Sequence, residues 1–115
     1  MKITHHFKEK EQLQILEVYN LLHEIENKQI LQEATARIEK GFTNFVVDFS
    51  SMPYMNSVGL SFLINLMKKV NESNGKLVLV HVNRAIERLL VMTKVRPMFT
   101  IKTDLKQGLE TMTNN

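Results

Sequence analysis

A serine stands where an apolar helix is expected to begin, in the segment Asn56-Ser57-Val58-Gly59. A loop with a proline, then small polar residues, then apolar residues at helical spacing is typical of a helix start. Asparagine and serine are among the best N-caps, so one interpretation of Ser57 is a plain cap. The other is chemical: a first helical turn offers free N–H groups and partial positive charge, which would accommodate a phosphate on Ser57.

Other residue patterns that could support catalysis or metal binding are missing from the sequence. The four glycines are isolated and form no phosphate-binding motif, and there is no cysteine for thiol chemistry or Cys-type zinc sites. His5 and His6 are neighbours near a predicted strand, so they point to opposite faces and cannot share a metal. No acidic pair has a spacing that forces two carboxylates into one site. We therefore predict no enzyme, metal or cofactor.

Length and charge place the chain in a broad class. The 115 residues correspond to one domain, 1–115. The net charge of +3 comes from scattered lysines and arginines rather than a basic face, which disfavours direct nucleic-acid binding. No signal peptide and no apolar segment of membrane-spanning length is present. We expect a cytoplasmic protein.

Hydrophobic periodicity predicts the elements of the first half. Two short strands are expected at 1–7 and 13–19, with "KEKEQ" as the turn between them. A helix follows over 27–40 and ends at Gly41, a residue suited to the left-handed cap. "FTNFVVDF" predicts a strand apolar on both faces. Helix 57–72 places Phe62 and Leu66 largely outside its main apolar stripe, so both are expected to be exposed.

The second half continues the alternation. "KLVLVHV" predicts a strand, Asn83 the N-cap of a third helix, and "RPMFTIK" a last strand. Asp104 and Gln107 have capping-box spacing before a C-terminal helix. The order β-β-α-β-α-β-α-β-α predicts an α/β fold with a mixed sheet of four to five strands and about four helices.

The run from "FVVDFSS" through "MNSVGLSFLINL" and "GKLVLV" to "AIERLLVMTKVRPMFTI" resembles the STAS domain. This is the fold of bacterial anti-sigma factor antagonists and of sulfate-transporter cytoplasmic tails. The likeness covers residues 43–112 well and the first forty weakly. The family signature, usually Asp-Ser-Ser/Ala/Thr-Gly-Leu, reads Asn56-Ser57-Val58-Gly59-Leu60 here.

The resemblance implies a regulatory function. An antagonist of this family binds an anti-sigma factor that is also a serine kinase of the histidine-kinase-like ATPase type. That kinase phosphorylates the first serine of the signature, Ser57 here, which dissociates the complex, and a serine phosphatase restores it. The implied interface surrounds the start of helix 57–72, and a weak homodimer is left open. The expected partner-binding residues are Asn20, His23, Met55, Asn56, Val58, Gly59, Phe62 and Leu66.

Two departures from the family pattern affect this expectation. An acidic residue normally precedes the serine, and here it is Asn56. A second acidic residue normally follows the second strand, where this chain has Asn20-Leu21-Leu22-His23. The alternative function is a constitutive STAS subunit of a larger assembly, such as a lipid-transport ATPase complex or a stress-signalling scaffold, without a phosphorylation switch.

Overall fold

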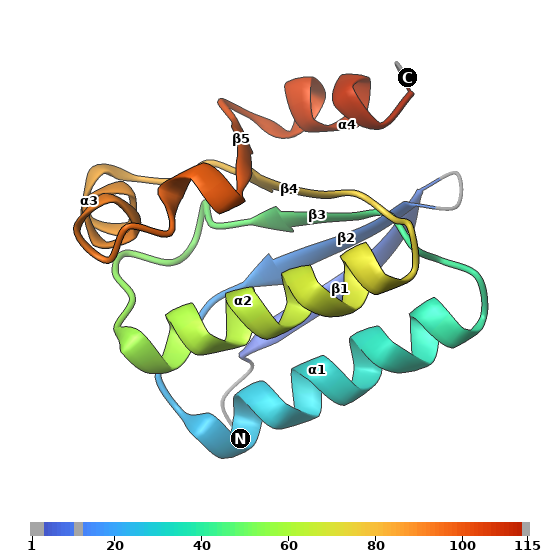
Figure 1. The fold of residues 1–115 in the computed structure, drawn as a ribbon, viewed down its shortest axis with the longest axis horizontal. Helices are drawn as coiled ribbons and strands as arrows, with labels where there is room; N and C mark the ends of the chain where they lie inside the picture. Colours follow the sequence, from blue (N-terminus) through green and yellow to red (C-terminus); the bar gives the residue numbers. More distant parts are fainter. Residues whose placement is uncertain (1–3, 11–12, 114–115) are drawn as a thin grey trace.

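Five strands form one mixed sheet in the computed structural model, which describes residues 4–10 and 13–113 (Figure 1). The strands follow one another across the sheet in sequence order. The first two pair antiparallel and all later neighbours pair parallel, which confirms the predicted mixed sheet. Their bounds are β1 His5–Lys10, β2 Leu13–Val18, β3 Phe45–Asp48, β4 Leu77–Val80 and β5 Thr100–Lys102.

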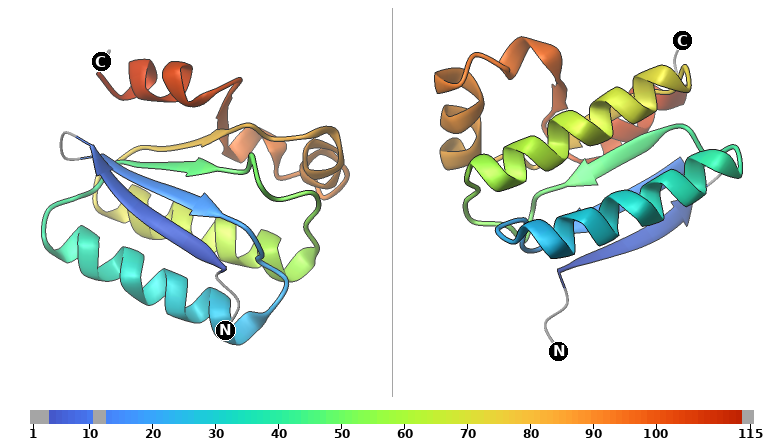
Figure 2. Two further views of the ribbon diagram at one scale, coloured as in Figure 1. Left: turned by 180° about the vertical axis from the view of Figure 1, so that it is seen from behind. Right: turned by 60° about the horizontal axis from the view of Figure 1, so that its bottom comes forward.

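Four α-helices cover the two faces of this sheet unequally. α1, α2 and α3 share the larger hydrophobic core with one face, and α4 packs alone on the other (Figure 2). The central strands are buried on both sides, so Val46 faces α4 whereas Val47 faces the larger core. The helices are α1 Glu24–Glu39, α2 Ser57–Glu72, α3 Arg84–Met92 and α4 Leu105–Thr113, with a short 3-10 helix, η1 Arg96–Met98.

The parallel strands bring three loops to one edge of the sheet. β2, β3 and β4 run in the same direction, so the loops that follow them, 19–23, 49–56 and 81–83, all leave from their C-terminal ends (Figure 1). Each loop leads into the first turn of α1, α2 or α3. This edge is where an open sheet of this kind normally presents a binding site.

The three crossover helices end in the same way. The residue after each C-cap has a positive φ: Gly41 at 100°, Asn74 at 60° and Lys94 at 64°. The N–H of the next residue then bonds back to a carbonyl of the last turn, as Val95 does to Leu90 at 3.1 Å. This is the Schellman arrangement, which satisfies carbonyls that a helix end leaves free. Gly41 thus confirms the predicted helix stop.

Several predicted boundaries are wrong. β1 starts at His5 and includes Lys8–Lys10, which we expected in the turn; an edge strand tolerates such charged side chains. The expected strand residues 1–3 and turn residues 11–12 lie outside the described part. α1 starts at Glu24 rather than 27, because its N-cap His23 makes no side-chain capping bond that a sequence pattern could reveal. Only 100–102 of the last predicted strand is a strand; 96–98 forms η1.

The prediction that Phe62 and Leu66 are exposed is also wrong. Phe62 is 3% and Leu66 0% exposed. The apolar stripe of α2 was assigned from the helix alone, but α2 packs against both the sheet and α1, so it buries a wider arc than one stripe. The bounds of α2, 57–72, agree with the prediction.

The repeated helix ending gives a paired stability prediction. Lys94 adopts a left-handed conformation that costs an L-residue with a Cβ about 1 kcal/mol, so Lys94→Gly should raise the free energy of unfolding by about that amount. Gly41→Ala should lower it by a similar ~1 kcal/mol, since nothing lies within 4 Å of the added Cβ and only the backbone strain acts. Urea denaturation measures both. Equal stabilities for Lys94→Gly and the wild type would contradict the assignment.

Candidate functional site

Ser57 is the first residue of α2, but it is not the cap. Asn56 holds that position, and its side-chain Oδ1 accepts the N–H of Val58 at 3.0 Å and of Gly59 at 3.3 Å. The interpretation of Ser57 as a plain N-cap is therefore wrong. Ser57 is exposed, and its hydroxyl has no hydrogen-bond partner among the described residues. The hydroxyl is free to react or to contact a partner.

The first turn of α2 offers a favourable environment for an anion. It contains no acidic residue. Helix N-termini carry about half a positive charge, which stabilises a negative group placed there. Asn56 supplies the same capping oxygen that an aspartate would, without its charge. The departure from the family signature therefore keeps the cap and removes like charge next to Ser57.

The loop before Ser57 is held in place by one side chain from the neighbouring loop. The Asn83 amide nitrogen donates to the carbonyls of Met52 and Pro53, both at 3.0 Å. The same side chain caps α3, because its Oδ1 accepts the N–H of Ile86 at 2.9 Å. The predicted cap is thus confirmed, and it has a second task. Asn83 ties the start of α3 to the loop that carries Ser57.

The start of the loop is fastened by Asp48 and by two methionines. The Asp48 carboxylate, 7% exposed at the end of β3, accepts the Ser50 N–H at 2.9 Å. Met52 and Met55 are buried and anchor the loop in the core. Tyr54 lies between them in sequence but is 56% exposed. The loop therefore presents one aromatic side chain next to Ser57.

On its other side, the first turn of α2 touches the loop between β2 and α1. A Cβ on Gly59 would lie 2.4 Å from Met55 Cγ and 3.1 Å from Leu21 Cβ, so glycine permits this close approach. The Asn27 amide donates to the Leu21 carbonyl at 2.8 Å, and Asn20 Oδ1 accepts the Leu22 N–H at 2.8 Å. These bonds fix the segment 20–22 against the start of α1, beside the first turn of α2.

Tyr19, at the end of β2, adds no charge to this edge. Its hydroxyl lies 3.4 Å from Glu17 Oε1, to which it donates. Partial burial, together with the Glu17 carboxylate, raises the pKa of the Tyr19 phenol above its ordinary value. The phenol therefore stays neutral at physiological pH.

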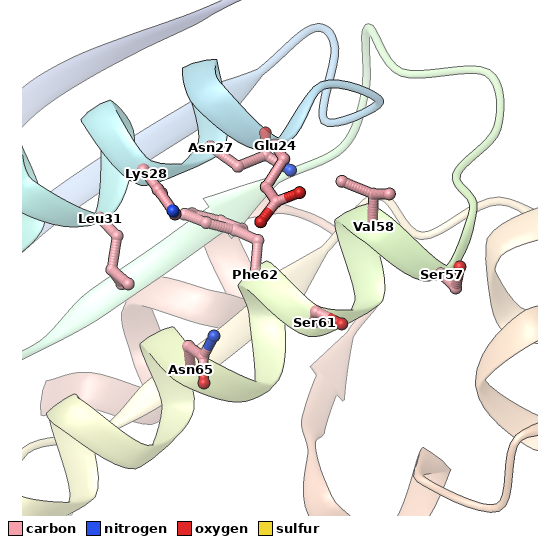
Figure 3. A pocket seen from close by; sticks show the side chains of 9 residues that line it. All are labelled: Glu24, Asn27, Lys28, Leu31, Ser57, Val58, Ser61, Phe62 and Asn65. Carbon is pink, nitrogen blue, oxygen red and sulfur yellow. The ribbon is translucent and has the colours of Figure 1, made fainter.

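A groove of about 290 Å³ runs between α1 and α2 and begins at Ser57 (Figure 3). Phe62 lies across it, and Glu24 extends from α1 towards the first turn of α2. Glu24 was missed by the sequence interpretation, which looked for a carboxylate at 23, one residue earlier. The groove is lined by Glu24, Asn27, Lys28, Leu31, Ser57, Val58, Ser61, Phe62 and Asn65.

The structure gathers most of the predicted partner-binding residues around Ser57 but buries several of them. Asn56 and His23 are exposed, and Asn20 and Val58 are half-buried. Met55, Gly59, Phe62 and Leu66 are buried, so in this conformation they support the surface from within. The large exposed apolar side chains at this edge are instead Tyr54 and Ile25, the latter 72% exposed on the first turn of α1. Ile25 is an isolated apolar residue among polar ones and Tyr54 belongs to a loop, so hydrophobic periodicity indicated neither.

Residues 4–10 and 13–113 contain no group of three His, Asp or Glu side chains placed to hold a metal. None of the helices in that part combines the length and the apolar character that crossing a membrane requires.

Comparison with known proteins gives the family of this fold and site. The sequence profile of the STAS domain matches residues 6–108, so the chain belongs to the STAS domain family. A Thermotoga maritima protein, named as a candidate anti-sigma factor antagonist, is 25% identical over 73 residues. That match covers 64% of this chain and 65% of the relative, so it spans just under two thirds of the relative's length.

Solved structures with the same fold include one whose subject is also named as a candidate anti-sigma factor antagonist from Thermotoga maritima. It superposes with a TM-score of 0.86 at 20% identity, covering 96% of this chain and 95% of that one. The anti-sigma factor antagonist SpoIIAA in its unphosphorylated form gives a TM-score of 0.81 at 12% identity, covering 96% and 97%. A Bacillus SpoIIAA structure in the phosphorylated form gives 0.73 at 14% identity, covering 93% and 97%.

The bonds made by Asn83 predict a graded loss of stability. Asn83→Ser keeps a capping oxygen but loses both bonds to the loop, which should cost about 1–2 kcal/mol. Asn83→Ala also loses the cap and should cost about 1 kcal/mol more. Both variants should speed hydrogen exchange at residues 54–56, measured by mass spectrometry. Unchanged exchange there in Asn83→Ser would show that the loop does not depend on this side chain.

Proposed function

We propose that this chain is a regulatory protein-binding domain that docks an anti-sigma factor with serine kinase activity of the histidine-kinase-like ATPase type. Docking uses the surface around Ser57, and phosphorylation of Ser57 releases the partner. A serine phosphatase resets the switch. The observation that carries the proposal is the exposed Ser57 hydroxyl, left without an internal partner because Asn56 has taken over the capping.

The surface around Ser57 supports docking as well as modification. Tyr54 and Ile25 are exposed apolar side chains on two of the elements that meet at this edge. Apolar side chains beside polar ones are typical of transient protein interfaces, where aromatic residues supply much of the binding energy. A phosphate would add between one and two negative charges at that surface. The phosphate would therefore add charge to a surface that a partner otherwise covers without removing a full charge from water at Ser57.

The names of the structural relatives agree with this proposal. SpoIIAA is named as an anti-sigma factor antagonist, and its structures carry unphosphorylated and phosphorylated forms in their names. That name describes an antagonist rather than an enzyme, and we propose no enzymatic activity for this chain. We extend the function named for SpoIIAA to this chain because of the position and exposure of Ser57.

A second function has one observation in its favour. Asn56 and His23 replace the two acidic residues expected beside the site, so a kinase that reads those charges would not recognise it. In that case the chain is a constitutive subunit of a larger assembly, with Ser57 unmodified. Glu24 favours the switch over this alternative. It places a carboxylate on the same groove as Ser57, where a kinase that reads acidic residues could recognise it in place of the two that are missing.

The switch predicts that Ser57→Asp weakens partner binding at least about tenfold, since a fixed negative charge then sits in the interface. Ser57→Ala, which removes the hydroxyl without adding charge, is the matched control and should bind like the wild type. Tagged forms of all three proteins are used to capture partners from the cell of origin, and calorimetry then measures affinity for the partner identified.

Two results would count against the switch. One is equal affinity for Ser57→Asp and Ser57→Ala. The other is the absence of phosphate on Ser57 under every growth condition, as judged by mass spectrometry of the native protein. Both together would remove the switch and leave the constitutive subunit as the better supported alternative.

A further inference from the structure

The outer face of α3 combines arginines with exposed apolar side chains. Residues 84, 88 and 92 follow one another at intervals of four, so they lie on one face of the helix. Arg84 and Arg88 are exposed, Met92 is 73% exposed and the adjacent Val91 55%. The inward face carries Ile86 and Leu90, both fully buried. Packing of α3 therefore does not require the residues of its outer face.

The cations on this face have no counter-charge within the described part of the protein. Glu87, the acidic residue in the first turn of α3, is paired with Arg96 at 2.8 Å. Arg84 and Arg88 form no ion pair with any described residue. Arg84 also occupies the first helical position, where the helix dipole disfavours a cation. Neither arginine is explained by the stability of the fold.

This face is continuous with the surface proposed to bind the partner. Asn83 immediately precedes Arg84, and its side chain holds the loop 52–53 that leads to Ser57. The ribbon views place α3 beside the N-terminal end of α2 (Figures 1 and 2). A partner that covers Tyr54 and Ser57 would therefore meet α3 next.

We propose that the outer face of α3, formed by Arg84, Arg88, Val91 and Met92, is a second contact surface for the partner, and that it takes an acidic protein segment carrying an apolar side chain. This rests on the proposed function for the identity of the partner. The charge complementarity is local: the groove on the α1 side of Ser57 carries Glu24 together with Lys28, whereas Arg84 and Arg88 on α3 have no paired carboxylate among the described residues.

The size of the surface favours a protein segment over other polyanions. Nine helical residues span about 13 Å, which suits a short helix or loop. Nucleic-acid binding normally neutralises several phosphates along a longer track, and lipid-binding clusters usually carry about four to eight cations. Two arginines flanked by exposed Val91 and Met92 fit neither. The apolar pair would instead receive one side chain of the segment.

An acidic partner also gives the switch a physical basis. The phosphate on Ser57 would bring its negative charge to a surface that attracts the partner through arginines. Repulsion between the phosphate and the acidic segment would then oppose docking, without any acidic residue at positions 23 or 56. Ordinary long-range electrostatics would make this repulsion weaker at high salt.

The test uses the full chain and a synthetic helical peptide of about 18 residues with glutamates on one face and leucines on the other. Fluorescence anisotropy measures its affinity at about 50 and about 500 mM salt. Arg84→Glu/Arg88→Glu should weaken binding about tenfold or more at low salt. Lys68→Glu/Lys106→Glu, which makes the same charge change on α2 and α4, is the control and should bind nearly as the wild type.

Two further variants separate apolar from charged contributions and guard against misfolding. Met92→Ser should weaken binding severalfold without changing its dependence on salt. Arg88→Ala is a milder change and should lose part of the affinity while its unfolding curve matches the wild type. Vesicles of phosphatidylcholine and phosphatidylserine and a short DNA duplex are the competing probes, and both should bind more weakly than the peptide.

The proposal is overturned if the peptide does not bind at low salt, if the two double variants lose affinity equally, or if vesicles or DNA bind more tightly. These results are independent of the Ser57 switch. Loss of peptide binding in Arg84→Glu/Arg88→Glu with no effect of Ser57→Asp on the native partner would retain α3 as a docking surface and remove the switch. The reverse pattern would remove α3 alone.

Discussion

The parallel pairing of β2, β3 and β4 is the constraint on which the site depends. Because these strands run in one direction, the loops after them meet at one edge, and three helices begin there within reach of one another. Asn83 turns that proximity into a fixed geometry. A single amide caps α3 and holds the carbonyls of Met52 and Pro53, so the position of Ser57 and that of the α3 arginines are set together. The Asn83 side chain thus links the loop before Ser57 to the first turn of α3.

The sequence predicted the parts of this arrangement that have a local cause. α2 was located because a polar turn precedes an apolar run, and Asn83 was identified as a cap from the residue type and its position. Asp104 likewise accepts the Gln107 N–H at 2.9 Å, as capping-box spacing indicates. These features need only a few adjacent residues, and tertiary packing did not override them.

Features with a non-local cause were missed or wrong. Phe62 is buried because α1 lies alongside α2, and no periodicity within α2 can report a neighbouring helix. Glu24 reaches the groove because α1 begins three residues earlier than predicted, at a cap without a side-chain bond. The sequence also left open whether Ser57 is the N-cap of α2, a position that Asn56 occupies in the structure. Both residue types can cap a helix, and only the backbone geometry decides which one does. The family resemblance indicated a candidate site, whereas contacts between elements decide which of its residues are accessible.

The sheet separates two cores, and this division affects how the molecule opens. The smaller core consists of a few residues beneath α4, among them Val46, Val80 and Met112, and α1–α3 take no part in it. Helices held by few apolar contacts open locally at lower free energy than the rest of a domain. Transient detachment of α4 would thus expose one face of the sheet while the face covered by α1, α2 and α3 keeps its packing. Local opening on the α4 side would therefore leave the geometry of the edge that carries Ser57 unchanged.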